Sequence, residues 1–237
     1  MTTLNESIVR FDQLFRDLGA RAQRSYPNES MIQFVAANWF SLEFEQRKNI
    51  RILEVGCGSG ANLWMLAKEG FSVFGLDSSQ TGLEIARDHL QGKWGVQARL
   101  ECGSVTTLPY EAGFFDAVID VVTLQHLNLH DSATALAEIR RVLKPGGRFF
   151  SYRISDRSSA FLNSGGVFVD AVTVDNVVNT GMPLHGNGPM SFWGASLARK
   201  MYLEQGLAIE SLERVSRSYG NGTSCVEYLA ISANKGD

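Results

Sequence analysis

Apolar residues near the start of the chain recur at the spacing of helices. Residues 4–18 and 30–44 carry apolar side chains three or four positions apart, and this predicts two amphipathic helices. Pro27 lies in the connection between them, and Ser30 is placed to cap the second helix. We therefore expect a helical segment ahead of the main body of the protein.

From residue 51 onward, short apolar runs alternate with segments of helical spacing. Strands are expected at 52–55, 71–77, 96–102, from 114, and at 148–154, and helices at about 60–69, from about 80 to Gly92, and from Asp131. Polar residues alternate with apolar ones at 96–102, so this strand is expected at a sheet edge.

The last third of the chain is less regular. Residues 155–190 are rich in turn residues and show no convincing periodicity apart from an apolar run near 167–178, which is typical of a lid. A helix is expected at about 195–205. Two strands, 207–216 and 224–232, then follow around a short glycine-containing turn, as in an antiparallel hairpin.

Size and charge restrict the classes of protein to consider. The chain has 237 residues, enough for one sizeable core but short for two domains. No segment is apolar enough to cross a membrane and the N-terminus lacks a signal pattern, so we expect a soluble, cytoplasmic protein. The net charge of −3 gives no reason to expect a nucleic-acid partner, and the three cysteines indicate neither a disulfide framework nor a zinc site.

A glycine-rich turn follows the first expected strand. Gly56, Gly58 and Gly60 stand at alternate positions between the strand and a helix, which predicts a turn whose backbone a nucleotide can approach closely. The spacing alone also fits a dinucleotide fingerprint. However, the carboxylate of Glu54, two residues earlier, would repel a pyrophosphate and would favour a cationic ligand.

Glu54 to Gly60 match the motif (D/E)-x-G-x-G-x-G, and here the chain resembles the class I methyltransferases that depend on S-adenosylmethionine (SAM). Residues 115–126 are similar to F-D-x-V-x-x-x-x-x-L-x-H of small-molecule members of the type-11 kind, and an L-K-P-G-G turn follows at 143–147. The likeness covers about residues 50–154.

The resemblance implies an α/β fold: a Rossmann-like sheet of seven strands in the order 3-2-1-4-5-7-6, with the last strand antiparallel and helices on both faces. It also implies SAM as cofactor, with S-adenosylhomocysteine (SAH) as product. We interpret the chain as one domain with four parts. These are a helical cap (1–47), a SAM-binding core (48–154), a lid that forms part of the substrate site (155–195), and a C-terminal helix and hairpin (196–237).

The expected cofactor-binding residues come from these motifs. Asp77, 17 residues after Gly60, is placed to accept hydrogen bonds from ribose hydroxyls, although it could instead cap the next helix, as Ser78 or Ser79 could. Ser104 stands where relatives often carry an acid that binds adenine. The full expected set is Tyr26, Glu54, Gly56, Cys57, Gly58, Gly60, Asp77, Ser78, Ser104, Val105 and Asp120.

Two histidines are candidate catalytic residues. By its position in the fourth motif, His126 would lie near the transferring methyl group, as a general base or as a residue that shapes the pocket. His185, in the expected lid, is the second candidate; a histidine in a glycine-rich loop can equally be solvated. No acidic cluster has metal-ligand spacing, so we expect metal-independent chemistry.

The expected function is therefore SAM-dependent methylation of a small molecule, at oxygen or nitrogen, with a saccharide or natural-product intermediate as one acceptor class. No N/D-P-P-Y motif of amino-directed nucleic-acid methyltransferases follows the fourth strand. A protein or RNA methyltransferase and a non-catalytic SAM-fold subunit remain as alternatives. A nicotinamide oxidoreductase is disfavoured by Glu54 and by the order of the later motifs. The oligomeric state is left open.

Overall fold

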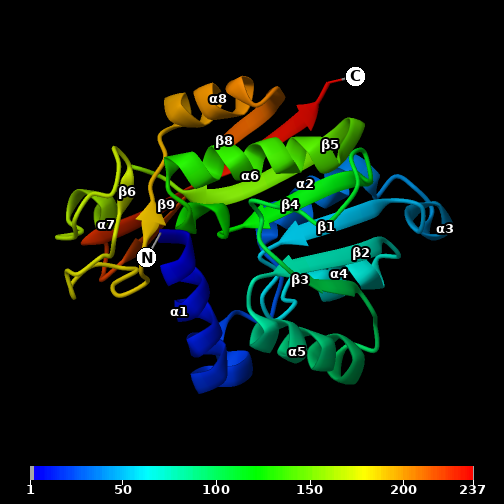
Figure 1. Ribbon diagram of the computed structural model, residues 1–237, viewed down its shortest axis with the longest axis horizontal. Coiled ribbons are helices and arrows are strands. Elements are labelled where there is room, and N and C mark those ends of the chain that lie inside the picture. The colour runs from blue at the N-terminus through cyan, green and yellow to red at the C-terminus, as the bar shows by residue number, and fades with distance from the viewer. Residues whose placement is uncertain (1–2, 237) are drawn as a thin grey trace.

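A seven-stranded sheet forms the centre of the computed structural model, which describes residues 3–236, with side chains from Glu6 onward (Figure 1). The strand order is β3-β2-β1-β4-β5-β9-β8. The strands are β1 (Arg51–Val55), β2 (Ser72–Asp77), β3 (Arg99–Cys102), β4 (Phe115–Val121), β5 (Leu143–Ile154), β8 (Leu207–Tyr219) and β9 (Ser224–Lys235). The first five are parallel, and β9 is antiparallel to both its neighbours. Since β8 and β9 are the sixth and seventh strands of this sheet, the predicted order 3-2-1-4-5-7-6 is confirmed.

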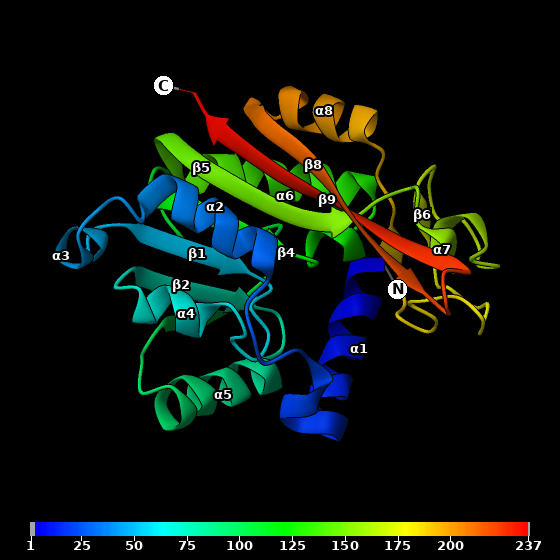
Figure 2. The same cartoon turned by 180° about the vertical axis from the view of Figure 1, so that it is seen from behind.

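Helices cover both faces of the sheet. Figure 1 shows α6 (Leu129–Val142) and α8 (Ala195–Glu204) on the near face, and Figure 2 shows α2 (Glu29–Trp39) and α4 (Leu63–Lys68) on the opposite face. Neighbouring residues of a strand point to opposite faces. The apolar core is therefore divided into two clusters, with Ile52 packed on the side of α2 and α4, and Leu53 on the side of α6 and α8.

The remaining central element is α5 (Gln80–Asp88), which continues into a short π-helical turn, η2 (His89–Lys93), and leads to β3. Strand β3 lies at the sheet edge, as predicted, but it is shorter than the expected range because residues 96–98 lie outside it. None of the helices within residues 3–236 is both long and apolar enough to cross a membrane.

Two predicted helix starts were wrong by two residues. Asn28, not Ser30, caps α2, because its side chain accepts a hydrogen bond from the Met31 N–H at 3.0 Å. Asn128 caps α6 in the same way, through the N–H of Asp131 at 2.8 Å, so that helix begins before Asp131. In both cases an asparagine side chain satisfies a backbone donor of the first helical turn.

The N-terminal helix α1 (Thr3–Leu18) is followed by a 3₁₀ turn, η1 (Gly19–Ala22), and the short α3 (Phe44–Arg47) precedes β1. Figures 1 and 2 show α1 beside the ends of the central strands and next to α5, rather than on either face of the sheet. This position brings the apolar side of α1 to the end of the sheet at which the parallel strands finish.

Residues 155–195, for which the sequence predicted no regular elements, contain three short ones: α7 (Ser159–Leu162), β6 (Thr173–Val174) and β7 (Met190–Ser191). The strands β6 and β7 form a small antiparallel ribbon. Phe192 and Met190 form a separate apolar cluster with Ile154 of β5 and Val226 of β9. The segment therefore packs against the end of β5 and the start of β9. Its role as a lid, and the division of the chain into four parts, stay predictions.

Candidate functional site

A cavity of about 340 Å³ lies where the strands β1, β2 and β4 end. Ligands of open α/β sheets bind at this end, outside the carboxyl ends of the strands. The cavity wall is formed by one side of α1, residues 22–24, the glycine turn, residues 76–78, residues 103–105, the 3₁₀ turn η3 (Leu124–His126) with its neighbours, and residues 184 and 187.

The glycine turn forms the floor of the cavity through Gly56 and Gly58. Both have positive φ angles, 67° and 50°, which side chains disfavour. A β-carbon on Gly56 would collide with the side chain of Thr123, and one on Gly58 with the amide of Gln23. Of the other predicted contacts of the turn, Gly60 faces Ala86 of α5 and Cys57 is buried in the core, and neither lines the cavity.

Glu54 lies beneath the turn, 1% exposed. One carboxylate oxygen accepts a hydrogen bond from the Asn62 amide, and the other, Oε2, finds no partner among the described residues. Burial raises the pKa of Glu54 to about 8. A buried acid with one oxygen unpaired fits a cationic or hydrogen-bond-donating ligand group above it. Glu54 itself does not reach the cavity wall.

Asp77, at the end of β2, lines the cavity and is 8% exposed. Its Oδ2 accepts from the Gly58 N–H at 2.7 Å and its Oδ1 from the Ser79 N–H at 2.8 Å. Burial raises the pKa of this carboxyl, while these hydrogen bonds oppose the rise. Each oxygen has a further lone pair for a hydroxyl of a ligand. The cap of α5 is Ser79, which leaves Ser78 on the cavity wall.

Ser104 and Val105 also line the cavity, whereas Asp120 lies behind it. Asp120 is fully buried, and its carboxylate accepts hydrogen bonds from the backbone of Thr123, the backbone of Leu124 and the hydroxyl of Ser151. These contacts hold the turn after β4. The structure thus places Asp120 behind the wall, where it supports the turn, and its predicted direct cofactor contact stays a prediction.

Tyr26, another predicted cofactor contact, lies away from the cavity, and its role stays a prediction. Its side chain is 64% exposed and packs edge-on against Trp64 and Trp94, outside the cavity. The same segment instead brings Gln23 and Arg24 to the wall. The Gln23 Oε1 accepts from the backbone N–H of Ser59 at 2.8 Å, so an amide lies directly on the glycine turn. Sequence reasoning missed both residues, because nothing in their spacing distinguishes them from a polar loop.

His126 lines the cavity at the end of η3, where the ring of Phe11 from α1 packs edge-on against it at 4.8 Å. Its Nδ1 lies 2.9 Å from the carbonyl oxygen of Pro189. Burial lowers the pKa of His126 to about 4, and Arg10 adds a smaller effect in the same direction. Its imidazole is therefore neutral at physiological pH.

His185 is not brought to the wall. Its Nδ1 lies 3.1 Å from the carbonyl oxygen of Val177, within the same segment, while its neighbours Leu184 and Asn187 do line the cavity. The two candidate histidines therefore differ in environment, and only His126 is placed to meet a ligand. Within residues 3–236 no group of three or more His, Cys, Asp or Glu side chains is arranged to hold a metal ion.

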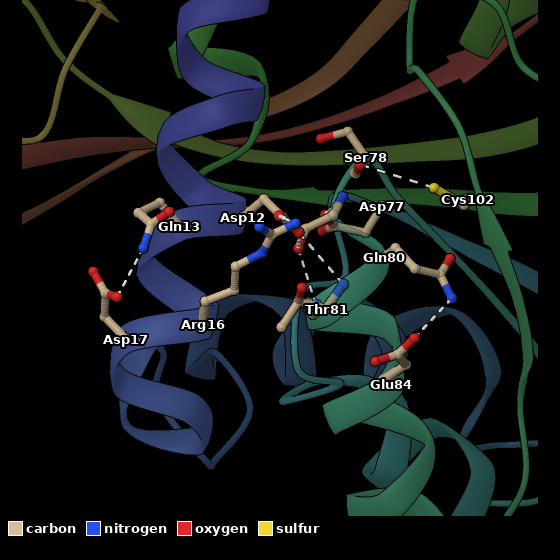
Figure 3. Close-up of polar contacts among 12 residues, drawn as sticks. Asp12, Gln13, Arg16, Asp17, Asp77, Ser78, Gln80, Thr81, Glu84 and Cys102 are labelled. Carbon is tan, nitrogen blue, oxygen red and sulfur yellow. Dashed lines mark hydrogen bonds and ion pairs between the residues drawn. The ribbon is translucent and has the colours of Figure 1, made fainter.

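Helix α1 is attached over the cavity by a polar contact to α5, shown in Figure 3. Asp12 points toward the start of α5 and accepts from the Ser79 hydroxyl at 2.7 Å and from the Thr81 N–H at 3.4 Å. The hydrogen bond from Ser79 is the main reason that the pKa of Asp12 is lowered. Arg16, one turn along α1, forms an ion pair with the same carboxylate at 2.7 Å.

The Asp12→Ala variant is expected to lose roughly 1 kcal/mol of stability, the scale of a helix-capping contact, because α5 loses an acceptor at its start. Urea unfolding measures the loss. The matched control is Asp17→Ala, since Asp17 is exposed on the same helix and bonds only Gln13 (Figure 3). Equal unfolding free energies of the two variants would show that the contact of Asp12 with the start of α5 does not stabilise the protein.

The lowered pKa of His126 predicts how stability depends on pH. Between pH 6.5 and about 4 the unfolded chain binds a proton that the folded protein does not. The folded state therefore loses stability as pH falls through this window, by at most about 1.4 kcal/mol per pH unit. Urea unfolding at pH 7.5 and pH 5 should show a larger loss for the natural chain than for His126→Asn. Equal losses in the two proteins would mean that the histidine titrates normally.

Part of the chain is similar to known methyltransferases. Residues 52–147 match a family model described as a methyltransferase domain. Over 157 residues the chain is 29% identical to a ubiquinone biosynthesis O-methyltransferase of Coxiella burnetii, a match that covers 66% of this chain and 65% of the relative. Over 99 residues it is 44% identical to an uncharacterized 37.1 kDa protein in transposon TN4556 of Streptomyces fradiae, covering 40% and 28%. The chain thus spans less than two thirds of these curated relatives.

Two solved structures have a similar fold. One, described under the conversion of a disulfide bond into a thioacetal group during echinomycin biosynthesis, superposes with a TM-score of 0.71 at 21% identity, covering 97% of this chain and 93% of the other. The second is a Burkholderia thailandensis 1,6-didemethyltoxoflavin-N1-methyltransferase with its substrate and SAH bound, with a TM-score of 0.62 at 18% identity, covering 99% and 88%. At these identities the likeness establishes the fold.

Proposed function

The chain carries a methyltransferase domain of the class I SAM-dependent family, and from that premise we propose that it transfers a methyl group from SAM to a small organic molecule. The acceptor atom is an oxygen or a nitrogen. The observation that carries this proposal is the shared cavity, whose wall includes Asp77 and the glycine turn together with His126 and apolar residues of α1.

The residues of the chain fit SAM in three respects. Asp77 has lone pairs available for the ribose hydroxyls, and Ser104 and Val105 line the wall where the family motif places adenine. Burial raises the pKa of Glu54, and the positive charge of a bound donor above the turn would lower it again, so that the ionised carboxylate and the donor stabilise each other. Arg24, whose Nε is buried without a partner in the described chain, is placed to meet the carboxylate of the amino-acid group.

When bound, SAM supplies an electrophilic methyl group on a sulfonium. The chain aligns the acceptor with that group and excludes water, and alignment of this kind contributes about 7 to 11 kcal/mol to well-oriented reactions. The apolar side of α1 excludes water from the cavity, and the neutral imidazole of His126 accepts the proton of the acceptor. A general base in that role contributes roughly 10² to 10⁴ in rate.

The segments that cover the cavity favour a small acceptor over a protein or an RNA. Residues of α1 and residues 184 and 187 lie on its wall, and the sequence has no excess of positive charge for a nucleic acid. The O-methyltransferase and N-methyltransferase among the similar proteins are compatible with either acceptor atom. A saccharide or natural-product intermediate stays one acceptor class, and a cytoplasmic location stays a prediction.

Incubation with methyl-labelled SAM and a panel of small metabolites tests this function, with SAH formation and label transfer as readouts. We expect label in at least one small molecule and none in added protein or RNA. Label in a macromolecule alone would favour the protein or RNA alternative. Tight SAH binding without transfer to any acceptor would favour a non-catalytic subunit.

A further inference from the structure

Gln125 precedes His126 in η3 and also lines the cavity, although its side chain is 96% buried. Its Oε1 accepts a hydrogen bond from the Ile154 N–H at 3.1 Å. Because a backbone N–H can only donate, this contact fixes which end of the amide is the oxygen. The NH₂ end of Gln125 is therefore turned toward His126.

The orientation of the His126 imidazole is fixed in a similar way. The carbonyl oxygen of Pro189 can only accept, so the Nδ1 of His126, 2.9 Å away, carries the proton. The neutral ring then has a lone pair on Nε2. That atom lies 3.5 Å from the Nε2 of Gln125. The Gln125 amide therefore donates a long hydrogen bond to this lone pair. A ligand hydroxyl that inserts between the two groups can replace this contact, and it then meets one donor and one acceptor, each set by a backbone group.

We propose that Gln125 and His126 form a binding site for a hydroxyl group, so that the acceptor atom is oxygen and the substrate is a phenol or an enol. The hydroxyl donates its hydrogen to Nε2 of His126, and its oxygen accepts from the amide of Gln125. This inference rests on the proposed function, and it narrows the acceptor from oxygen or nitrogen to oxygen alone.

The number of lone pairs separates an oxygen from a nitrogen acceptor at this pair. An oxygen that accepts from Gln125 keeps a second lone pair with which to attack the methyl carbon. An amine nitrogen has one lone pair, and a hydrogen bond from Gln125 would occupy it. An amine that attacks with its lone pair can therefore bond only His126 and leaves the Gln125 donor unpaired, whereas a hydroxyl satisfies both groups, so the pair favours a hydroxyl.

The surroundings favour an acidic hydroxyl over a sugar. Ile8 and Phe11 of α1 and Leu127 contribute apolar surface to the cavity. Burial keeps His126 a weak base, with a pKa of about 4. Proton transfer to it costs least from a phenol or enol, whose hydroxyl is more acidic than that of an alcohol, and an apolar wall suits an aromatic ring better than a polyol.

In the methyl transfer at this site, one bond forms, one bond breaks and one proton moves. The bond between the acceptor oxygen and the methyl carbon forms as the bond between that carbon and the sulfur breaks, and the sulfur keeps the electron pair. The hydroxyl proton moves to Nε2 of His126, while the Nδ1–H of the ring keeps its hydrogen bond to the Pro189 carbonyl oxygen. The imidazolium later releases the Nε2 proton to water.

The first test compares two probes of similar shape, p-cresol and toluene. Each is added to the SAH-loaded protein labelled with ¹⁵N at histidine, and the Nε2 resonance of His126 is followed. We expect the starting resonance of an unprotonated Nε2, a clear shift with p-cresol, and little change with toluene. A starting resonance typical of a protonated Nε2, or equal responses to p-cresol and toluene, would overturn the proposal.

The Gln125→Glu variant sharpens this test. It keeps the shape and the acceptor for Ile154 but replaces the donor by a second acceptor, so p-cresol should bind roughly tenfold more weakly, the effect of one lost hydrogen bond. Gln97→Glu, at an exposed position, is the matched control and should bind p-cresol as the natural chain does. Equal p-cresol affinities for the two variants would refute the role of Gln125.

The second test is the product. For any acceptor found with labelled SAM, NMR of the product locates the labelled methyl group. The same transfer reaction is then repeated with p-toluidine added as a competing acceptor. An O-methyl product supports the site, and an N-, C- or S-methyl product contradicts it. Failure of SAH to bind would instead count against the proposed function itself, so the two failures are distinguishable.

Discussion

The Asp77→Ala variant is expected to bind SAM and SAH roughly 10- to 150-fold more weakly than the natural chain. The loss of one charge-assisted hydrogen bond costs about 1.5 to 3 kcal/mol. Asp77 also holds the N–H groups of Gly58 and Ser79, so the variant loosens the glycine turn as well as losing the acceptor for ribose. Isothermal calorimetry with SAH gives the change in affinity.

The Asp88→Ala variant is the matched control, because Asp88 is an exposed acid at the end of α5. Its SAH affinity should equal that of the natural chain. Urea unfolding of the Asp77 variant shows whether the protein remains folded under the conditions of the titration. A folded Asp77→Ala protein with unchanged SAH affinity would refute the ribose assignment.

Changing His126 to asparagine is expected to lower kcat by roughly 10², the lower end of the usual contribution of a general base, because the lowered pKa of this histidine makes it a weak base, while SAM affinity stays within about twofold. Asparagine can still donate a hydrogen bond toward the Pro189 carbonyl, which retains the turn, but it has no basic nitrogen at the position of Nε2. Single-turnover measurements with labelled SAM separate methyl transfer from product release.

His130→Asn is the control for this variant, since His130 is exposed on α6 and lies away from the cavity. It should turn over like the natural chain. If His126→Asn retains full turnover, then this histidine only shapes the wall, and the assignment of a base is wrong.

The fold was predictable because local signals agreed with one another. The apolar run at 52–55, the glycines after it and the acid at Asp77 each indicate one part of a nucleotide-binding unit, and the structure brings Gly56, Gly58 and Asp77 together as expected. The cofactor contacts of Cys57 and Gly60 stay predictions: the turn places Cys57 in the core and Gly60 against α5, and the sequence motif does not show which of its members face the cavity.

The N-terminal helical segment, residues 1–47, could be predicted only in part. The amphipathic pattern of residues 4–18 predicted α1, but it did not show what the apolar side of α1 packs against. That depends on residues far along the chain, such as His126, which contacts Phe11. In the next segment, Tyr26 was the more conspicuous side chain, yet Trp64 and Trp94 hold it on the surface. Gln23 reaches the glycine turn instead, and a single glutamine in a polar loop carries no sequence signal.

The segment 155–195 was the hardest to predict because its order depends on distant partners. Met190 and Phe192 are buried against Ile154 and Val226. Contacts between residues so far apart in the sequence cannot be predicted from the spacing of apolar residues within a short segment. The same holds for Gln125: its role depends on the Ile154 N–H at the end of β5, which the sequence places 29 residues away.

If the glycine turn, Glu54 and Asp77 form a site for SAM, the purified chain should bind SAH and SAM saturably at one site per chain and should not bind NAD. Calorimetric titration with SAH, SAM and NAD measures all three affinities. Binding of NAD with no affinity for either SAM or SAH would contradict the assignment of this site.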